Sequence, residues 1–181
     1  MKKIFFIPLL MMTITTYAQK YFTKTGFTEF KASVETFEPV EAKNNSTTVV
    51  FKEDTGEIAA LLFIKAFNFK IALMEEHFNE NYMDSDIYPK ATFKGEIVNY
   101  DPSFLSEKEK EYDLKGVLTI KGKSKEINTK IKLKTVNNTI ILDSMFTVNP
   151  EGFNIKIPGI VRKKITKKIQ INLHYELTKK G

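Results

Sequence analysis

The sequence predicts an all-β protein, built as an antiparallel barrel or sandwich. Three observations support this prediction: apolar and polar residues alternate over several segments, turn signals separate those segments, and helical patterns are few. We expect about eight strands and one or two short helices, with no strand–helix–strand rhythm of a parallel sheet. The 181 residues, of which 42% are hydrophobic, suffice for one domain with a core of its own.

The clearest alternation lies in the second half of the chain. Between Ile169 and Leu177 every odd-numbered residue is apolar, which predicts a strand with one buried and one solvated face. The segment from Ile127 to Leu133 alternates in the same way. The residues from Lys121 to Ser124 separate it from Val117–Ile120, and we expect a hairpin whose glycine permits the turn. Another strand is expected over Thr139–Val148.

The first half of the chain is less regular. Strands are expected within Lys20–Val34, Thr47–Lys52 and Thr92–Tyr100, and a polar loop over Asp101–Lys110. The apolar run Glu57–Leu73 is longer than the usual strand, so we expect a bend or bulge within it. Helical signals are confined to Met74–Met83 and to a single turn after Pro158-Gly159, over Ile160–Lys164.

The N-terminus has the layout of a secretory signal peptide. Lys2 and Lys3 precede the mostly apolar run Ile4 to Tyr17, and the small residue Ala18 follows. The alternative is an N-terminal membrane anchor, but the run is shorter than the about 20 residues that span a bilayer. We therefore expect residues 1–18 to be removed, residues 19–181 to form one domain, and the protein to be periplasmic or secreted.

Composition excludes several chemistries. The chain has no cysteine, so it has no thiol nucleophile, disulfide framework or cysteine zinc site. It has two histidines, too few for a histidine-rich metal site, and 15 phenylalanines without a tryptophan. An exported protein without disulfides has to be held by its core, so we expect these aromatic residues to matter for the interior.

No catalytic set is evident. His77 and His174 are the only imidazoles; His174 falls on the polar face of the last expected strand, and His77 lacks the second histidine of a His-Glu-x-x-His motif. The adjacent acids Glu75 and Glu76 would point in different directions on a helix or a strand. We predict no catalytic residue, no metal and no cofactor; an enzyme acting on lipid would have to use His77 or a carboxylate.

The densest basic stretch comprises Arg162-Lys163-Lys164 and Lys167-Lys168. One interpretation is a solvated strand or helix face. A second is a transient contact with anionic lipid headgroups or a membrane surface. Nucleic acid is the third, and export argues against it, so we expect no nucleic-acid partner.

Two segments, His77–Gly95 and Gly116–Ile127, are distinctive together. The matching residues are Ser85, Tyr88, Pro89 and Phe93 in the first, and Gly116, Leu118, Thr119, Ile120, Gly122 and Lys125 in the second. With the tail Phe153–Pro158, they resemble the YceI-like family of exported bacterial proteins, over about Lys20 to Leu177. The chain departs from the family at Lys121, where many members have histidine, and at Glu75–Glu80, where many have an Arg-Asp pair. It also lacks the usual early tryptophan.

The resemblance implies an extended lipocalin-like antiparallel barrel of about eight strands around a long apolar cavity. The implied ligand is a polyisoprenoid or similar long-chain amphiphile, carried without catalysis. Such a site needs inward-facing apolar residues and a few polar groups at one mouth. The candidate lining residues are Phe63, Phe67, Phe69, Phe78, Tyr82, Tyr88, Phe93, Ile120, Ile131, Phe146 and Phe153, with His77 and Asn81 at the mouth. The alternative is a structural or interaction β-protein whose interior is filled, because periodicity does not separate a packed interior from a hollow one.

Overall fold

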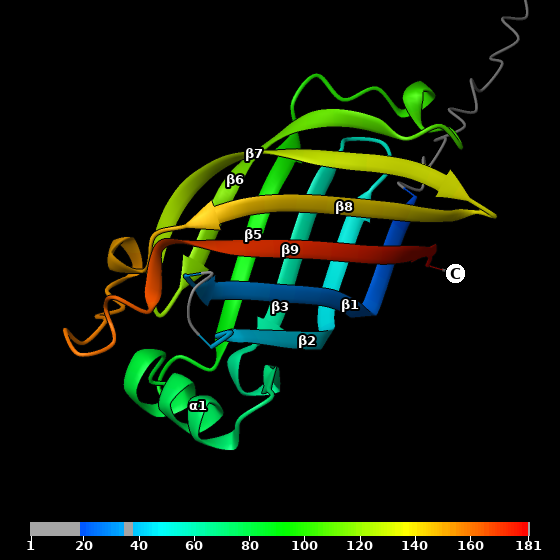
Figure 1. The fold of residues 1–181 in the computed structure, drawn as a ribbon. Helices are drawn as coiled ribbons and strands as arrows, with labels where there is room; N and C mark the ends of the chain where they lie inside the picture. The colour runs from blue at the N-terminus through cyan, green and yellow to red at the C-terminus, as the bar shows by residue number, and fades with distance from the viewer. Residues whose placement is uncertain (1–18, 35–37, 181) are drawn as a thin grey trace, which may run out of the picture.

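A computed structural model describes residues 19–34 and 38–180 of the chain. The predicted signal peptide, residues 1–18, lies outside the described residues. Most of the described chain is β-strand, wrapped into a single closed antiparallel barrel (Figure 1). The predicted fold class is therefore confirmed.

Eight strands form the barrel wall. They are β1 (Lys20–Ser33), β2 (Glu41–Lys52), β3 (Glu57–Phe63), β5 (Lys90–Ile97), β6 (Lys110–Ile120), β7 (Lys123–Val136), β8 (Thr139–Val148) and β9 (Ile165–Lys179). They are hydrogen-bonded in the order β1-β9-β8-β7-β6-β5-β3-β2, and the pairing of β1 with β2 closes the barrel. The two-residue strand β4 (Asn68–Phe69) is added to β2. Closure leaves none of the eight wall strands with a free edge.

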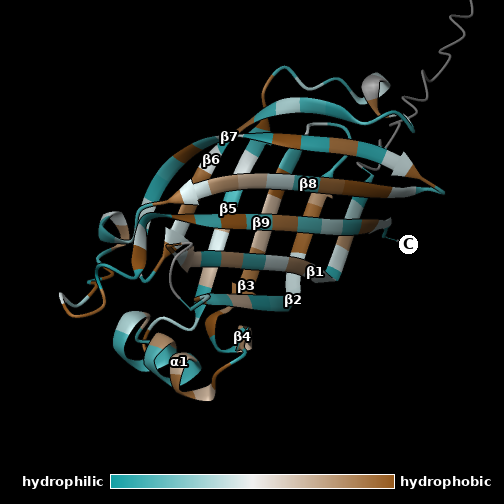
Figure 2. Cartoon of the chain, viewed as in Figure 1, coloured by the Kyte–Doolittle hydropathy of each residue, from teal (hydrophilic) through white to brown (hydrophobic). Residues whose placement is uncertain are grey.

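Apolar and polar residues alternate along the wall, so that one face of each strand points into the barrel (Figure 2). Strand β8 has the predicted bounds. Strands β6 and β7 form the predicted hairpin, in which Ile120 pairs with Lys123 across a two-residue turn. Lys121 and Gly122 both have positive φ, of 48° and 69°, as a type I′ turn requires.

The long apolar run Glu57–Leu73 bends as expected. Strand β3 ends at Phe63, and a 3-10 turn, η1 (Ile64–Ala66), leads the chain out of the wall. Helix α1 (Ala72–His77) and the π-helical turn η2 (Phe78–Tyr82) follow, which confirms the helix predicted over Met74–Met83. The segment Pro158–Lys164 forms consecutive hydrogen-bonded turns and not a helix. Two other 3-10 turns are η3 (Pro102–Phe104) and η4 (Pro150–Phe153).

The two ends of the barrel differ. We call one the closed end: there a large cluster of buried side chains, including Phe51, Tyr112 and Leu177, fills the interior below the β2–β3, β5–β6 and β7–β8 connections. We call the other the helix end, where smaller clusters around Phe30 and Ile64 pack beneath α1 and η2. No helix within the described residues is long and apolar enough to cross a membrane.

Candidate functional site

A cavity of about 170 Å³ lies inside the barrel, between the packed closed end and the helix end. Side chains from all eight wall strands line it, joined at the helix end by Phe78, Met83 and Ile155. Within the described part of the chain, neither a charged side chain nor a histidine lines this space. Because unpaired charges are strongly disfavoured in such surroundings, the cavity suits an uncharged, apolar group.

Three buried hydroxyl groups are the main polar feature of the cavity wall. Thr28 Oγ1 lies 2.8 Å from Thr47 Oγ1 and 3.1 Å from the Tyr175 hydroxyl, on three different strands. Burial raises the pKa of Tyr175 to about 12, so its hydroxyl is uncharged at neutral pH. These groups satisfy one another, and the polar atoms therefore leave the cavity essentially apolar.

Two paired glycines shape the wall around Phe93. Gly95 on β5 and Gly116 on β6 are cross-strand partners. Both lie on the inner face of the barrel wall, as does Phe93, which lines the cavity. A Cβ atom at either glycine would be 2.5 Å from Cζ of Phe93. The ring of Phe93 therefore occupies the space of two missing side chains and lies along the wall, which leaves the cavity centre open.

Four phenylalanines close part of the helix end, and we call them the aromatic cluster: Phe30, Phe67, Phe69 and Phe78. The ring of Phe78 is stacked on that of Phe30, with centroids 5.2 Å apart, and lies 5.7 Å from Phe67 and 5.1 Å from Phe69. Phe69 is held in place through its backbone N–H, which donates to Glu75 Oε2 of α1 at 3.1 Å. Phe30, Phe67 and Phe78 also line the cavity, so the cluster separates it from the region under α1.

A lysine ties the other side of the helix end together. Lys121 Nζ, at the β6–β7 turn, lies 2.7 Å from Asp84 Oδ2 and donates to the Tyr82 carbonyl oxygen at 2.9 Å. The side chain of Lys121 is only 14% exposed. Tyr88 lies over the same turn, close to Gly122. The turn therefore fixes the segment that follows η2 against the barrel.

The structure brings six of the predicted lining residues together around the cavity: Phe67, Phe78, Phe93, Ile120, Ile131 and Phe146. Whether these side chains contact a ligand stays a prediction.

The other predicted site residues lie outside the cavity lining. Phe63 is 49% exposed and has Lys90 Nζ 5.3 Å from its ring centroid. Phe69 and Tyr82 pack behind the lining, Tyr88 is exposed, and Phe153 is buried in η4. His77 and Asn81, the predicted mouth residues, are exposed on α1 and η2.

Sequence reasoning missed several lining residues, notably Thr28, Thr47, Tyr175, Met83 and Ile155. The alternation in β9 does place Tyr175 among the inward-facing residues, but its partners come from strands far away in the sequence. No local pattern marks Thr28 or Thr47 as buried. Met83 and Ile155 lie outside the strands, where the period-two pattern gives no direction.

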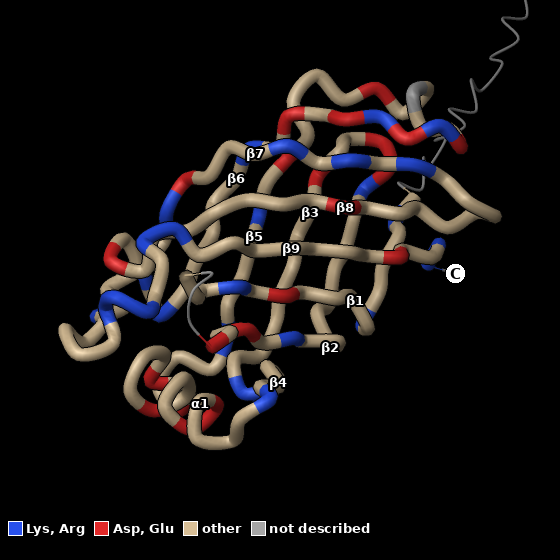
Figure 3. The backbone as a smooth tube through the Cα atoms, in the orientation of Figure 1, with Lys and Arg blue, Asp and Glu red and all other residues tan. Residues whose placement is uncertain are grey.

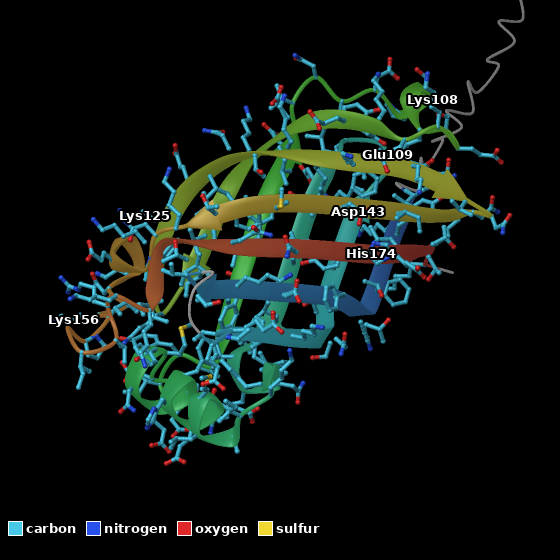
Figure 4. All side chains as sticks on the ribbon, in the orientation of Figure 1. Lys108, Glu109, Lys125, Asp143, Lys156 and His174 are labelled. Carbon is cyan, nitrogen blue, oxygen red and sulfur yellow. The ribbon has the colours of Figure 1, made fainter. Side chains whose placement is uncertain are left out.

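The described residues contain no group of three or more acidic, histidine or cysteine side chains that could hold a metal ion. His174 lies on the outer wall, where its Nδ1 is 2.6 Å from Asp143 Oδ1 on the neighbouring strand (Figure 4). Because this pair is on the outside of the barrel, it does not contribute to the cavity.

A closed eight-stranded antiparallel barrel around an apolar cavity places the protein in the class of small up-and-down β-barrels with an interior cavity. The chain belongs to the YceI-like domain family, whose model matches residues 11–177. No curated protein matches the sequence.

Solved structures share the fold at low sequence identity. A polyisoprenoid-binding domain from Saccharophagus degradans, implicated in plant cell wall breakdown, is 12% identical with a TM-score of 0.76, over 90% of this chain and 99% of that one. BcnA from Burkholderia cenocepacia is 18% identical with a TM-score of 0.67, over 84% and 96%. The YceI protein of Campylobacter jejuni is 17% identical with a TM-score of 0.61, over 80% and 87%.

Proposed function

We propose that the protein is exported and carries or sequesters a polyisoprenoid, or a similar long-chain amphiphile, inside the barrel, without catalysing a reaction. The observation on which the proposal rests is the cavity, which is lined by mostly apolar side chains, with every wall strand contributing, and by no charged group among the described residues. The description of a structural relative as a polyisoprenoid-binding domain supports the choice of ligand class.

The physical basis is the transfer of hydrocarbon out of water. Each buried CH₂ group contributes about 0.8 kcal/mol, so an isoprenoid tail needs no polar contact to bind. A charged or strongly polar headgroup would be costly in this interior and stays in solvent. The closed end is packed, so the tail enters from the helix end and the headgroup remains there.

The cavity volume limits how much tail fits without movement. About 170 Å³ is similar to engineered protein cavities of about 150 Å³ that hold one benzene molecule. The barrel as it stands therefore accepts about one or two isoprene units, and a longer tail has to displace side chains. Within the aromatic cluster, Phe78 is the side chain to move, because it belongs to the short turn η2 and not to the wall. The small size of the cavity is also the observation that favours the second candidate, an interaction β-protein whose interior is mostly filled by side chains.

A filled-cavity variant distinguishes the two candidates. Ala60 lines the cavity, whereas its neighbour Ala59 is exposed on the outer face of β3. We expect farnesol to bind the unaltered protein in calorimetric titration, and Ala60→Phe to weaken binding at least about tenfold because the added ring occupies the space of the tail. Ala59→Phe is the matched control and should bind as the unaltered protein does. Equal binding by both variants, or none by the unaltered protein, would contradict the proposal.

A further inference from the structure

The positive charge of this protein is concentrated in one segment at the helix end. Residues 154–170 contain six basic residues and no acidic one. The whole chain has 28 basic and 22 acidic residues, so the rest is balanced at 22 of each. The six are Lys156, Arg162, Lys163, Lys164, Lys167 and Lys168. In Figure 3 this basic group occupies the β8–β9 connection and the start of β9.

These basic side chains are free of the ion pairs that neutralise lysines elsewhere on the barrel. Lys130 and Lys132 on β7, for example, lie 2.7 Å from Asp113 and 3.0 Å from Glu109. Within the described part of the chain, none of the six has a carboxylate within ion-pair distance, and all six are exposed. Their charge is therefore available to an external anion.

An apolar side chain stands at the tip of the same segment. Ile160 is 90% exposed, more than any other large hydrophobic side chain that the structure describes. It follows Gly159, where an added Cβ atom would have no contact within 4 Å beyond the adjacent residues. Both residues lie on the turns over Pro158–Lys164, which project from the barrel in Figure 1. Nearly the whole side chain of Ile160 is therefore in contact with water.

The tip has a defined base. Val161 N–H donates to the Pro158 carbonyl oxygen at 3.1 Å, and Lys164 N–H donates to that of Val161 at 2.9 Å. The carbonyl oxygen of Lys164 in turn accepts from Val34 N–H at 3.0 Å, at the end of β1. Ile160 and its basic neighbours are therefore presented together on a hydrogen-bonded turn.

We infer that the segment 154–170 is a docking surface for a membrane rich in anionic lipids. Basic residues near such a surface each strengthen binding about fivefold at low ionic strength. An apolar side chain at the centre of the basic group enters the headgroup and acyl boundary, where its hydrocarbon leaves water. An exposed isoleucine beside basic residues without ion pairs fits a membrane interface better than a soluble anion, because a soluble anion would not bury the isoleucine side chain.

Docking in this way brings the helix end of the barrel to the lipid. Ile155, five residues before the tip, lines the cavity, and so does Ile169 on β9 just beyond the basic group. The helix end would then face the membrane while the closed end faces away. This orientation rests on the proposed function, since it places the tail entrance next to lipid; the docking itself does not depend on it.

Vesicle binding by three variants tests the inference. We would measure co-sedimentation of the purified protein with phosphatidylcholine vesicles, with and without phosphatidylglycerol, at low and high salt. The unaltered protein should bind only the anionic vesicles, and added salt should release it. Removing three charges in Arg162→Gln, Lys163→Gln, Lys164→Gln together should weaken binding about a hundredfold. Ile160→Ser should weaken it about tenfold.

A charge-matched control separates position from net charge. Lys115→Gln, Lys130→Gln and Lys132→Gln together remove the same number of charges from the barrel wall and should change vesicle binding less than about threefold. Equal loss in the control and in the loop variant would overturn the inference. So would equal binding to neutral vesicles, or heparin binding as tight as vesicle binding together with no effect of Ile160→Ser.

Farnesol titration of the same variants distinguishes a failure of the docking inference from a failure of the proposed function. The loop variants should bind farnesol as the unaltered protein does, which also shows that they are folded. Binding of farnesol without binding to anionic vesicles would refute the docking inference and leave the carrier proposal standing. Binding to anionic vesicles through Ile160 and the loop, without binding of farnesol, would refute the carrier proposal and leave the docking inference standing.

Discussion

The ring of Phe93 lies directly against the backbone of Gly116 on the neighbouring strand, so closely that a Cβ atom at Gly116 would be 2.5 Å from its Cζ atom. Gly95 stands in the same relation to the ring from the other strand. The width of the cavity next to Phe93 therefore depends on the absence of two side chains.

Gly116→Ala should narrow the cavity. The added methyl group would meet the Phe93 ring and the backbone of β5, so the ring has to turn toward the cavity centre. We expect a loss of about 1–3 kcal/mol in the free energy of unfolding and weaker farnesol binding. Denaturant unfolding and calorimetry measure the two effects. Gly159→Ala, at a position with open space around it, is the control; unchanged farnesol binding in Gly116→Ala would show that the glycine pair does not shape the site.

Phe78→Ala should loosen the helix end. It removes the ring that contacts the other three members of the aromatic cluster. We expect a bound isoprenoid to dissociate about ten times faster or more, because this ring covers the tail. Stopped-flow displacement with excess competitor measures the rate. Leu73→Ala, exposed on the adjacent α1, should release ligand at the original rate.

The sequence was sufficient for the wall of the barrel. Residues 169–177 of β9 alternate strictly, and Lys121-Gly122 marks a two-residue turn, so the predicted positions of β9 and of the β6–β7 hairpin agree with the observed ones. Strand β2 begins at Glu41, earlier than the predicted Thr47. The first residues of β2 are mostly polar, so they do not show the apolar pattern of a strand. Asn44 among them is fully buried, where its side chain donates to the Phe63 carbonyl oxygen and accepts from Ser46 N–H. A buried asparagine of this kind has no local signature.

The site was less predictable because it depends on the bend after β3. Phe63 and Phe67 are four residues apart and would lie on one face of a continuous strand. The 3-10 turn between them leaves Phe63 exposed and buries Phe67 against the cavity. Likewise the Thr28, Thr47 and Tyr175 group requires the closure of β1 on both β2 and β9, which a linear pattern does not reveal.

Tyr175→Phe should reduce stability at neutral pH and change its dependence on high pH. Burial raises the folded-state pKa of Tyr175 from 10.0 to about 12, so its contribution is fully present below pH 10 and is lost as the pH rises toward 12. The unaltered protein should lose about 2 kcal/mol more than the variant over that range. Denaturant unfolding of the two proteins between pH 7 and pH 12 measures the free energy of unfolding and its dependence on pH. The same pH dependence in both proteins would contradict the raised pKa of Tyr175.

Protonated His174 should stabilise the fold slightly. The hydrogen bond to Asp143, followed by one to Glu176, raises the pKa of His174 above its ordinary 6.5. The stabilisation is therefore present below about pH 6.5 and fades as the pH rises through the folded-state pKa. Because the pair is exposed, it amounts to less than about 1 kcal/mol. An NMR titration should show this elevated pKa in the unaltered protein and a lower one in Asp143→Asn; equal values would rule out the ion pair as its cause.

Native mass spectrometry of the protein purified from cells that export it, followed by mass analysis of an organic extract, tests the central claim most directly. The proposed carrier should retain a long-chain isoprenoid or similar amphiphile at close to one per chain, and Ala60→Phe should retain much less than Ala59→Phe. A chain of unliganded mass whose extract contains no lipid, and which remains unliganded when offered farnesol, would contradict the account and favour an interaction β-protein without a ligand.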